Sequence, residues 1–181
     1  MPSPLDTIPQ TTQDFALVKE LLYNLVVVNK YTKVLETGTD VGDSTRIFST
    51  ALQATQGQLV TVDHKPPVND WLATWPIKNI QFVQGDSRQL KLNQEVDLLF
   101  LDAHQDGTDA YQQVGTELKQ LGVWVKAGGK IVADDWYHTT FGAGIQKAVE
   151  EFGQVHQLAW TVYPHGHGLV VVEVSHALPR A

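Results

Sequence analysis

The sequence predicts an α/β protein with a Rossmann-like, seven-stranded and mostly parallel sheet, helices on both faces and a C-terminal antiparallel hairpin. Two observations support this fold class. Short apolar runs typical of buried strands alternate with segments whose apolar residues recur at helical spacing. Most of these runs are also followed directly by a carboxylate residue. Strands separated by helices of roughly 10 to 15 residues indicate βαβ units, which form parallel sheets.

The elements follow one another regularly along the chain. Helical spacing occurs in four main segments: residues 12–29, 44–52, 111–121 and 145–152. A further helix-like stretch lies near residues 70–73. Apolar runs typical of strands occupy seven segments: residues 34–35, 59–62, 80–83, 96–101, 131–133, 158–163 and 169–174. We expect Ser44 or Asp43 to cap the second helix, and Gly128 with Gly129 to close the third main helix.

Length and composition favour a single domain over residues 1–181, with a helical region at 1–30 and a core at 33–175. The net charge is −7 and basic residues form no run, so neither nucleic acid nor an anionic membrane is an expected partner. The absence of cysteine excludes disulfides, thiolate metal sites and cysteine nucleophiles. The N-terminus lacks a signal-peptide pattern and no apolar run could span a bilayer, so we expect a cytoplasmic protein.

A glycine-containing turn follows the first predicted strand, in the segment ETGTDVGDS from Glu36. A dinucleotide-binding turn needs three glycines in the pattern G-x-G-x-x-G, whereas this turn has Gly38 and Gly42 with Asp40 in the second glycine's place. Carboxylates in the turn repel a pyrophosphate. The turn therefore favours a cofactor that lacks phosphate and carries positive charge, as S-adenosylmethionine does, over a nicotinamide dinucleotide.

The next two strands also end in residues suited to a nucleoside. Asp63 follows the second strand, where a carboxylate can accept hydrogen bonds from both ribose hydroxyls. The alternative is that Asp63 only caps the following helix. Asp86 and Ser87 follow the third strand and would face the adenine, or would only form a turn.

These motifs together resemble the class I S-adenosylmethionine-dependent methyltransferases over nearly the full chain. The segments that carry the resemblance are VLETGTDVGDST, LVTVDHK, FVQGDSRQL, VDLLFLDAHQD, LGVWVKAGGKIVADDW and the terminal hairpin. Within the class, the chain is most similar to metal-dependent O-methyltransferases of small molecules, of the catechol type and the antibiotic-sugar type. The resemblance implies an S-adenosylmethionine site formed by ten residues: Glu36, Gly38, Thr39, Gly42, Ser44, Asp63, His64, Asp86, Ser87 and Asp102.

A group of three carboxylates indicates a metal site beside the cofactor. Asp102 ends one strand and Asp134 with Asp135 end the next, so these acids should converge at one edge of the sheet. Mg²⁺ would neutralise them, and it prefers oxygen ligands. Catechol-type enzymes resemble this pattern, with Asn where this chain has Asp135. The alternative is that Asp102 contacts the cofactor, Asp135 caps a helix and no metal binds.

The resemblance also suggests a base. Catechol-type enzymes use a lysine, and this chain has Gln105 at that position; the adjacent His104 resembles the histidine base of the sugar-modifying relatives. The alternatives are that His104 is only exposed, or that His138 acts instead. His165 and His167 have no third ligand nearby in sequence, so we expect a polar turn there.

The expected function is therefore metal-assisted O-methylation of a small hydroxylated molecule, in which Asp102 and His104 are the catalytic residues. One helix precedes the first strand, so the acceptor pocket is expected to be open or completed by the second subunit of a homodimer. Two alternatives remain: a methyltransferase that uses no metal and acts on another nucleophile, and a non-catalytic binding module of the same fold. A nicotinamide-dependent oxidoreductase is disfavoured by the missing third glycine.

Overall fold

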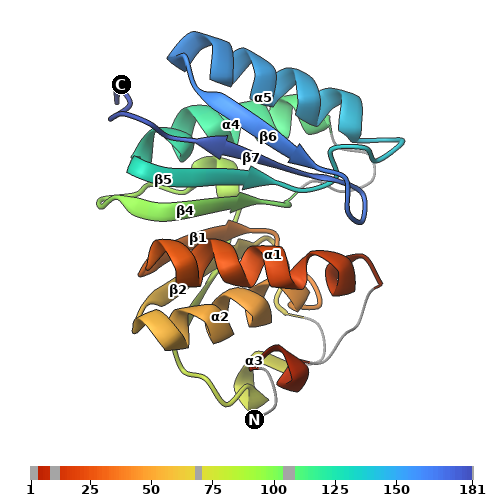
Figure 1. Cartoon of the computed structure of the whole chain (residues 1–181), viewed down its shortest axis with the longest axis vertical. Coiled ribbons are helices and arrows are strands. Elements are labelled where there is room, and N and C mark those ends of the chain that lie inside the picture. Colours follow the sequence, from red (N-terminus) through yellow and green to blue (C-terminus); the bar gives the residue numbers. More distant parts are fainter. Residues whose placement is uncertain (1–3, 9–12, 68–70, 104–108, 181) are drawn as a thin grey trace.

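A computed structural model of the chain describes residues 4–8, 13–67, 71–103 and 109–180. Within them, seven strands form one sheet in the order β3-β2-β1-β4-β5-β7-β6 (Figure 1). Strands β1 to β5 run parallel, and β7 lies antiparallel to both β5 and β6. The strands are β1 (Lys33–Thr37), β2 (Gln58–Asp63), β3 (Ile80–Gln84), β4 (Val96–Leu101), β5 (Val125–Ala133), β6 (Ala159–Tyr163) and β7 (Leu169–Glu173). The predicted sheet and its terminal hairpin are confirmed.

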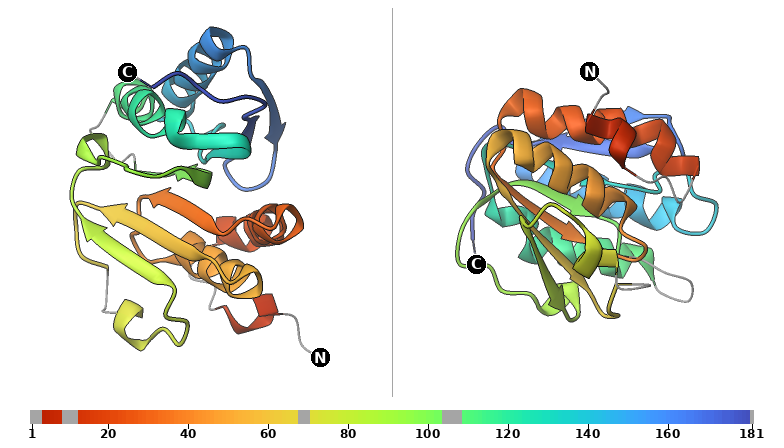
Figure 2. Two further views of the ribbon diagram at one scale, coloured as in Figure 1. Left: turned by 90° about the vertical axis from the view of Figure 1, so that its left-hand side faces the viewer. Right: turned by 90° about the horizontal axis from the view of Figure 1, so that it is seen from below.

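Helices cover both faces of the sheet (Figure 2). The α-helices are α1 (Gln13–Asn29), α2 (Asp43–Thr55), α3 (Trp71–Thr74), α4 (Ala110–Gln120) and α5 (Gly142–His156). Short 3-10 helices are η1 (Pro4–Thr7), η3 (Ser87–Gln89) and η4 (Gly122–Trp124). Every residue of β4 is buried, and its neighbouring side chains Leu99 and Phe100 enter opposite cores, under α4–α5 and under α1–α2. Burial on both faces is why β4 forms a nearly continuous apolar run in the sequence.

The N-terminus of α2 differs from the prediction. Gly42 occupies the N-cap position with a left-handed φ of 83°, and no side chain caps the helix. The hydroxyl of Ser44 instead donates to the Glu36 carboxylate at 2.5 Å, and Asp43 lies in the first turn. The expected side-chain cap is therefore wrong, because the buried carboxylate of Glu36 takes the hydroxyl that would have served as the cap.

The predicted helix closure at Gly128 and Gly129 is also wrong. Helix α4 ends at Gln120, and both glycines lie inside β5, which is longer than predicted. The register between β4 and β5 shifts at this point, as in a β-bulge. Gly128 has a φ of 83°, and a Cβ on Gly129 would lie 2.5 Å from the carbonyl oxygen of Asp97. The glycines allow the bulge rather than ending a helix.

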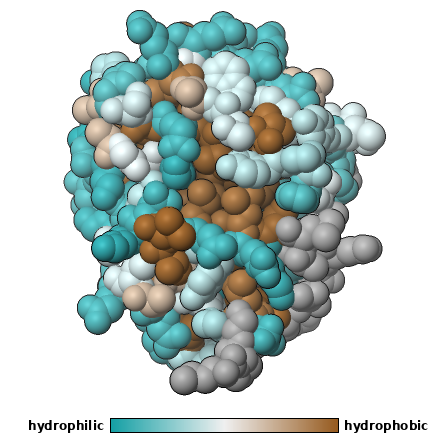
Figure 3. Space-filling view, in the orientation of Figure 1, coloured by the Kyte–Doolittle hydropathy of each residue, from teal (hydrophilic) through white to brown (hydrophobic). Residues whose placement is uncertain are grey.

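The face seen in Figure 3 carries apolar side chains in its middle, over the central strands and α1, within a hydrophilic margin. Among the residues that the structure describes, three large apolar side chains are exposed: Val28, Tyr137 and Val155. No helix in those ranges is long and apolar enough to cross a membrane.

Candidate active site

The carboxyl ends of the parallel strands are tied together by backbone hydrogen bonds. The amide of Gly38 donates to Val62, that of Asp102 to Thr37, and that of Asp134 to Leu101, over 2.8 to 3.2 Å. A fourth bond, from the Gly85 amide to the Asp63 carbonyl at 2.8 Å, joins β2 to β3. These bonds hold the residues that follow five neighbouring strands at one edge of the sheet, which is where open α/β sheets bind ligands.

A cavity of about 560 Å³ opens at this edge. It is bordered by residues from the ends of β1 to β4 and from α4: Gly38, Asp40, Val62, Asp63, His64, Lys65, Pro66, Gly85, Asp86, Ser87, Arg88, Asp102, Ala103 and Gln113. Six residues of the predicted cofactor set are therefore at the cavity: Gly38, Asp63, His64, Asp86, Ser87 and Asp102. The cavity is lined by side chains of both charges, because Lys65 and Arg88 border it together with the expected carboxylates.

Both glycines of the turn after β1 occupy places that a side chain could not. Gly38 has a φ of 88°, and a Cβ there would lie 2.1 Å from the carbonyl oxygen of Asp102. Gly42 has a φ of 83°, and its Cβ would lie 2.1 Å from the indole ring of Trp71. The turn thus packs against the end of β4 on one side and against α3 on the other, and both contacts require glycine.

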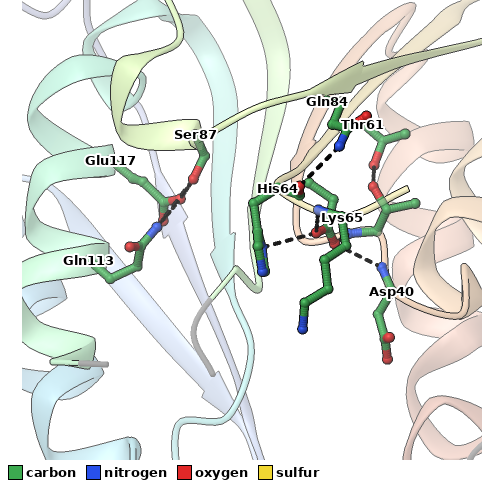
Figure 4. Close-up of polar contacts among 10 residues, drawn as sticks. Asp40, Thr61, His64, Lys65, Gln84, Ser87, Gln113 and Glu117 are labelled. Atoms are coloured by element: carbon green, nitrogen blue, oxygen red, sulfur yellow. Dashed lines mark hydrogen bonds and ion pairs between the residues drawn. The ribbon is translucent and has the colours of Figure 1, made fainter. Parts of the chain in front are cut away.

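Asp63 anchors this turn from the end of β2. Its Oδ2 accepts hydrogen bonds from the backbone amides of Thr39 at 2.9 Å and Asp40 at 3.1 Å. Its Oδ1 accepts from the Lys65 amide at 2.9 Å and lies 3.2 Å from Nδ1 of His64 (Figure 4). A carboxylate offers about four acceptor positions, so the protein itself uses most of them. Asp63 therefore connects the cavity rigidly to the glycine turn.

Glu36 lies beneath the turn, fully buried, and does not border the cavity. Its two carboxylate oxygens accept hydrogen bonds from Ser44 at 2.5 Å and Thr45 at 2.6 Å. Burial raises the pKa of Glu36 to about 7, although these hydrogen bonds act in the opposite direction. The predicted contact of Glu36 and Ser44 with the amino-acid end of the cofactor stays a prediction; in this structure the two side chains hold α2 against β1.

A second polar cluster lies at the end of β3. Ser87 donates to Oε1 of Glu117 at 2.5 Å, and Nε2 of Gln113 donates to the same oxygen at 2.9 Å and to Ser87 Oγ at 3.2 Å (Figure 4). All three side chains are buried. Nearby, the Asp86 carboxylate caps η3 and accepts three hydrogen bonds from Arg88, which lower the pKa of Asp86. Asp86 thus forms the turn that was its alternative role and also borders the cavity.

Asp102, Asp134 and Asp135 lie close enough to interact. Burial first, and then repulsion from Asp134 and Asp135, raises the pKa of Asp102 well above its usual value. Asp134 Oδ1 accepts the amide of Asp135 at 2.8 Å, and Asp135 Oδ1 lies 3.1 Å from Nδ1 of His167. In the described ranges, no three His, Asp or Glu side chains are arranged to hold a metal ion. As they stand, the residues do not fit the predicted Mg²⁺ site.

The histidines divide into three cases. His104, the predicted base, and Gln105 lie outside the described residues. His138 Nδ1 accepts the amides of Thr140 at 3.2 Å and Phe141 at 3.4 Å. This ring therefore holds the backbone that precedes α5. Sequence analysis expected only a polar turn at His165 and His167; in the structure His167 pairs with Asp135, because the β6–β7 turn lies beside the end of β5.

Gln113, Lys65 and Arg88 were missed, although they border the cavity. Arg88 and Lys65 each lie one or two residues beyond a predicted site residue, which is a usable sequence signal. Gln113 had no such signal, because α4 reaches the cavity only through its packing beside η3.

Comparisons with known proteins identify the family and the fold of the chain. A family model described as a methyltransferase domain matches residues 35–136, which is more than half of the chain. No curated protein sequence matches significantly. Solved structures with the same fold include cofactor-bound Rv0187 from MTB, with a TM-score of 0.71 and 20% identity over 95% of this chain and 85% of that chain. A putative caffeoyl-CoA O-methyltransferase from Staphylococcus aureus gives 0.68 and 16% over 93% and 86%. The O-methyltransferase TomG from Streptomyces achromogenes, in complex with SAM, gives 0.63 and 17% over 97% and 91%.

The structural relatives establish the fold, and the family model establishes the family. The matched residues run from β1 to just beyond β5, so they include the glycine turn, Asp63, Ser87 and Asp102. The predicted resemblance to methyltransferases is confirmed by the family model, and the chain shares its fold with solved proteins named as O-methyltransferases. The chain belongs to the methyltransferase-domain family.

Proposed function

We propose that the protein binds S-adenosylmethionine in the cavity at the carboxyl edge of the sheet and transfers its methyl group to an oxygen of a small hydroxylated molecule. One observation carries the proposal: Asp63, Asp86 and Asp102, each at the end of a different strand, border a single cavity of about 560 Å³. That volume suits a small-molecule cofactor. Two structural relatives named as O-methyltransferases support oxygen as the acceptor.

The cofactor's parts would lie along the row of strand ends. Asp63 retains acceptor capacity for a ribose hydroxyl while its remaining bonds keep the Thr39–Asp40 turn in place. Gly38 lets the turn after β1 pack against the Asp102 backbone at the cavity. The carboxylates of Asp40 and Asp102 favour a cofactor with a sulfonium and an ammonium group. Glu36 and Ser44 hold the start of α2 in position beneath this turn.

When bound, S-adenosylmethionine supplies an electrophilic methyl group and leaves as S-adenosylhomocysteine. The protein's part is to align the acceptor oxygen with that methyl group and to remove the proton that the oxygen loses. We assign proton removal to His104, which follows Asp102 by two residues. His138 suits this task less well, because its Nδ1 already accepts backbone amides at the start of α5.

Assistance by Mg²⁺ at Asp102, Asp134 and Asp135 is a separate part of the proposal. Its support is that burial, and then repulsion from Asp134 and Asp135, raises the pKa of Asp102, and a cation would relieve the repulsion. Because the described residues are not arranged to hold an ion, no chemical step depends on it here. Thermal unfolding with excess Mg²⁺ and with EDTA tests it: Mg²⁺ should stabilise the wild type and leave Asp134→Asn unchanged. An identical melting temperature and turnover in both conditions would contradict it.

Calorimetry and turnover test the main proposal. S-adenosylhomocysteine should bind the wild-type chain with one site, and absence of binding would overturn the proposed function. With S-adenosylmethionine and a panel of catechols and hydroxylated sugars, formation of S-adenosylhomocysteine should depend on the acceptor and fall in His104→Gln. Binding without turnover of any acceptor would instead indicate a binding module of the same fold.

A further inference from the structure

Gln113 reaches the cavity from α4 and is fixed there by two buried partners. Its side chain is only 6% exposed, yet it borders the cavity beside Ser87 and Gly85. Figure 4 shows Gln113, Ser87 and Glu117 together on one side of the view, with Asp40, His64 and Lys65 on the other. Adenine is expected at this end of the cavity, because it lies beyond the ribose position at Asp63.

The chemistry of the partners determines which way the Gln113 amide faces. The Glu117 carboxylate accepts hydrogen bonds, and the Ser87 hydroxyl already donates its proton to it. Gln113 must therefore present its NH₂ group to this pair, and one amide proton is shared between Glu117 Oε1 at 2.9 Å and Ser87 Oγ at 3.2 Å. Its carbonyl oxygen, Oε1, receives no hydrogen bond from any described residue. Because Gln113 borders the cavity and this pair holds its NH₂ group, Oε1 is the acceptor that the side chain has left to offer a ligand.

The more obvious acceptor at this end of the cavity is already occupied. Asp86 follows β3 directly, but Arg88 donates its backbone amide and Nε to Oδ1 and its NH2 nitrogen to Oδ2. A ligand donor that approaches Asp86 must compete with this ion pair. Oε1 of Gln113 faces no such competition, so it is the better partner for a donor on the ligand.

We propose that Gln113 selects adenine, its Oε1 accepting a hydrogen bond from the 6-amino group of the bound nucleoside. The inference rests on the proposed function and names the base-reading residue of that same site. A 6-oxo purine would place an acceptor opposite an acceptor and is disfavoured. Glu117 contributes as a positioning residue, because it holds the Gln113 amide without facing the ligand itself.

Calorimetry with S-adenosylhomocysteine and S-inosylhomocysteine tests the proposal. The wild type should bind the adenosyl compound about tenfold more tightly, as the loss of one hydrogen bond predicts. In Gln113→Met this ratio should fall to near one, because the adenosyl compound loses affinity and the inosyl compound does not. The control Gln112→Met, on an exposed neighbour in α4, should keep the wild-type ratio.

The outcomes separate this inference from the function on which it rests. If neither compound binds the wild type, the proposed function fails and this inference with it. If both bind equally, or if Gln113→Met keeps the wild-type ratio, only the role of Gln113 is overturned. Glu117→Gln adds a readout of positioning: it frees the Gln113 amide to reverse, so the ratio should fall while the adenosyl compound still binds.

A wild-type measurement keeps the proposal testable if the variants do not fold. The analogue that has hydrogen at the purine 6-position loses the donor without gaining an acceptor. It should therefore bind with an affinity between those of the adenosyl and inosyl compounds. An inosyl compound that binds as tightly as the 6-hydrogen analogue would contradict the proposed contact.

Discussion

The Oδ2 atom of Asp63, at the end of β2, accepts a hydrogen bond of 2.9 Å from the backbone amide of Thr39, in the turn after β1. At the opposite edge of the sheet, Asp97 makes the equivalent connection: its Oδ2 accepts two backbone amides at the start of β1. Two aspartates thus fix the two ends of one central strand. Asp63 borders the cavity and Asp97 does not.

This pair gives a matched test of the cofactor site. Asp63→Asn and Asp97→Asn should each lower the free energy of unfolding by about 1–3 kcal/mol, because each replaces a charged carboxylate that accepts backbone amides with a weaker neutral acceptor. Only Asp63→Asn should weaken S-adenosylhomocysteine binding, by about tenfold or more. Urea denaturation and calorimetry measure the two effects. Equal weakening by both variants would mean that the loss reflects folding and not the site.

Gly38 and Gly128 form a second matched pair, since both have a φ between 80° and 90° but only Gly38 is closely packed. Gly128→Ala should cost about 1–2 kcal/mol for the left-handed backbone alone, because nothing lies within 4 Å of its added Cβ. Gly38→Ala should cost at least about 2 kcal/mol more, since its Cβ meets the carbonyl of Asp102. Thermal or chemical denaturation checks this order; similar losses would rule out the close approach.

Glu36 should make stability depend on pH. Its pKa is raised from 4.5 to about 7, so between these values the folded state holds a proton that the unfolded state has released. The free energy of unfolding should therefore fall as pH rises through this range, by on the order of 3 kcal/mol. In Glu36→Gln this contribution is absent. Urea denaturation from pH 5 to pH 8 measures it, and parallel curves for the two proteins would disprove it.

Trp71 should support cofactor binding from beneath the turn. Its indole fills the space beside Gly42 and stacks on the guanidinium of Arg46 at 4.3 Å, whereas the neighbouring Trp75 donates to Ser49. Trp71→Leu and Trp75→Leu should each destabilise the protein by about 2–4 kcal/mol through lost packing. We expect only Trp71→Leu to reduce affinity for S-adenosylhomocysteine as well. Unchanged affinity in that variant would show that the turn holds its shape without the indole.

Most of the fold could be predicted because its signals are local. The run of residues 96–101 is apolar because both faces of β4 are buried, and its bounds were predicted without error. Asp97, the one charged residue in that run, is explained only by the structure, in which it bonds the start of β1 and Lys126. The bulge at Gly128 was missed because a bulge depends on the register between two strands, which one strand's sequence does not contain.

The site was predicted less completely, because its contacts, like the bulge, join segments that are distant in sequence. Strand-end residues such as Asp63 and Asp102 could be placed because parallel strands end at one edge. The side-chain partners could not, because they come from distant segments: Ser87 meets Glu117 across 30 residues, and Asp135 meets His167 across 32. Such pairs follow from helix packing and strand register. The direction of the Ser44 side chain also depends on where α2 begins. In the structure it points to Glu36 and not to the cavity.

The position of β7 has a consequence for how the chain is made. This strand comes last in sequence order, yet it lies between β5 and β6 and hydrogen-bonds to both. During translation the edge of β5 therefore has no partner until residue 173 has been synthesised. An incomplete nascent chain exposes an apolar strand edge, which is a site for aggregation or chaperone contact. The sheet can be completed only after the residues up to 173 have left the ribosome.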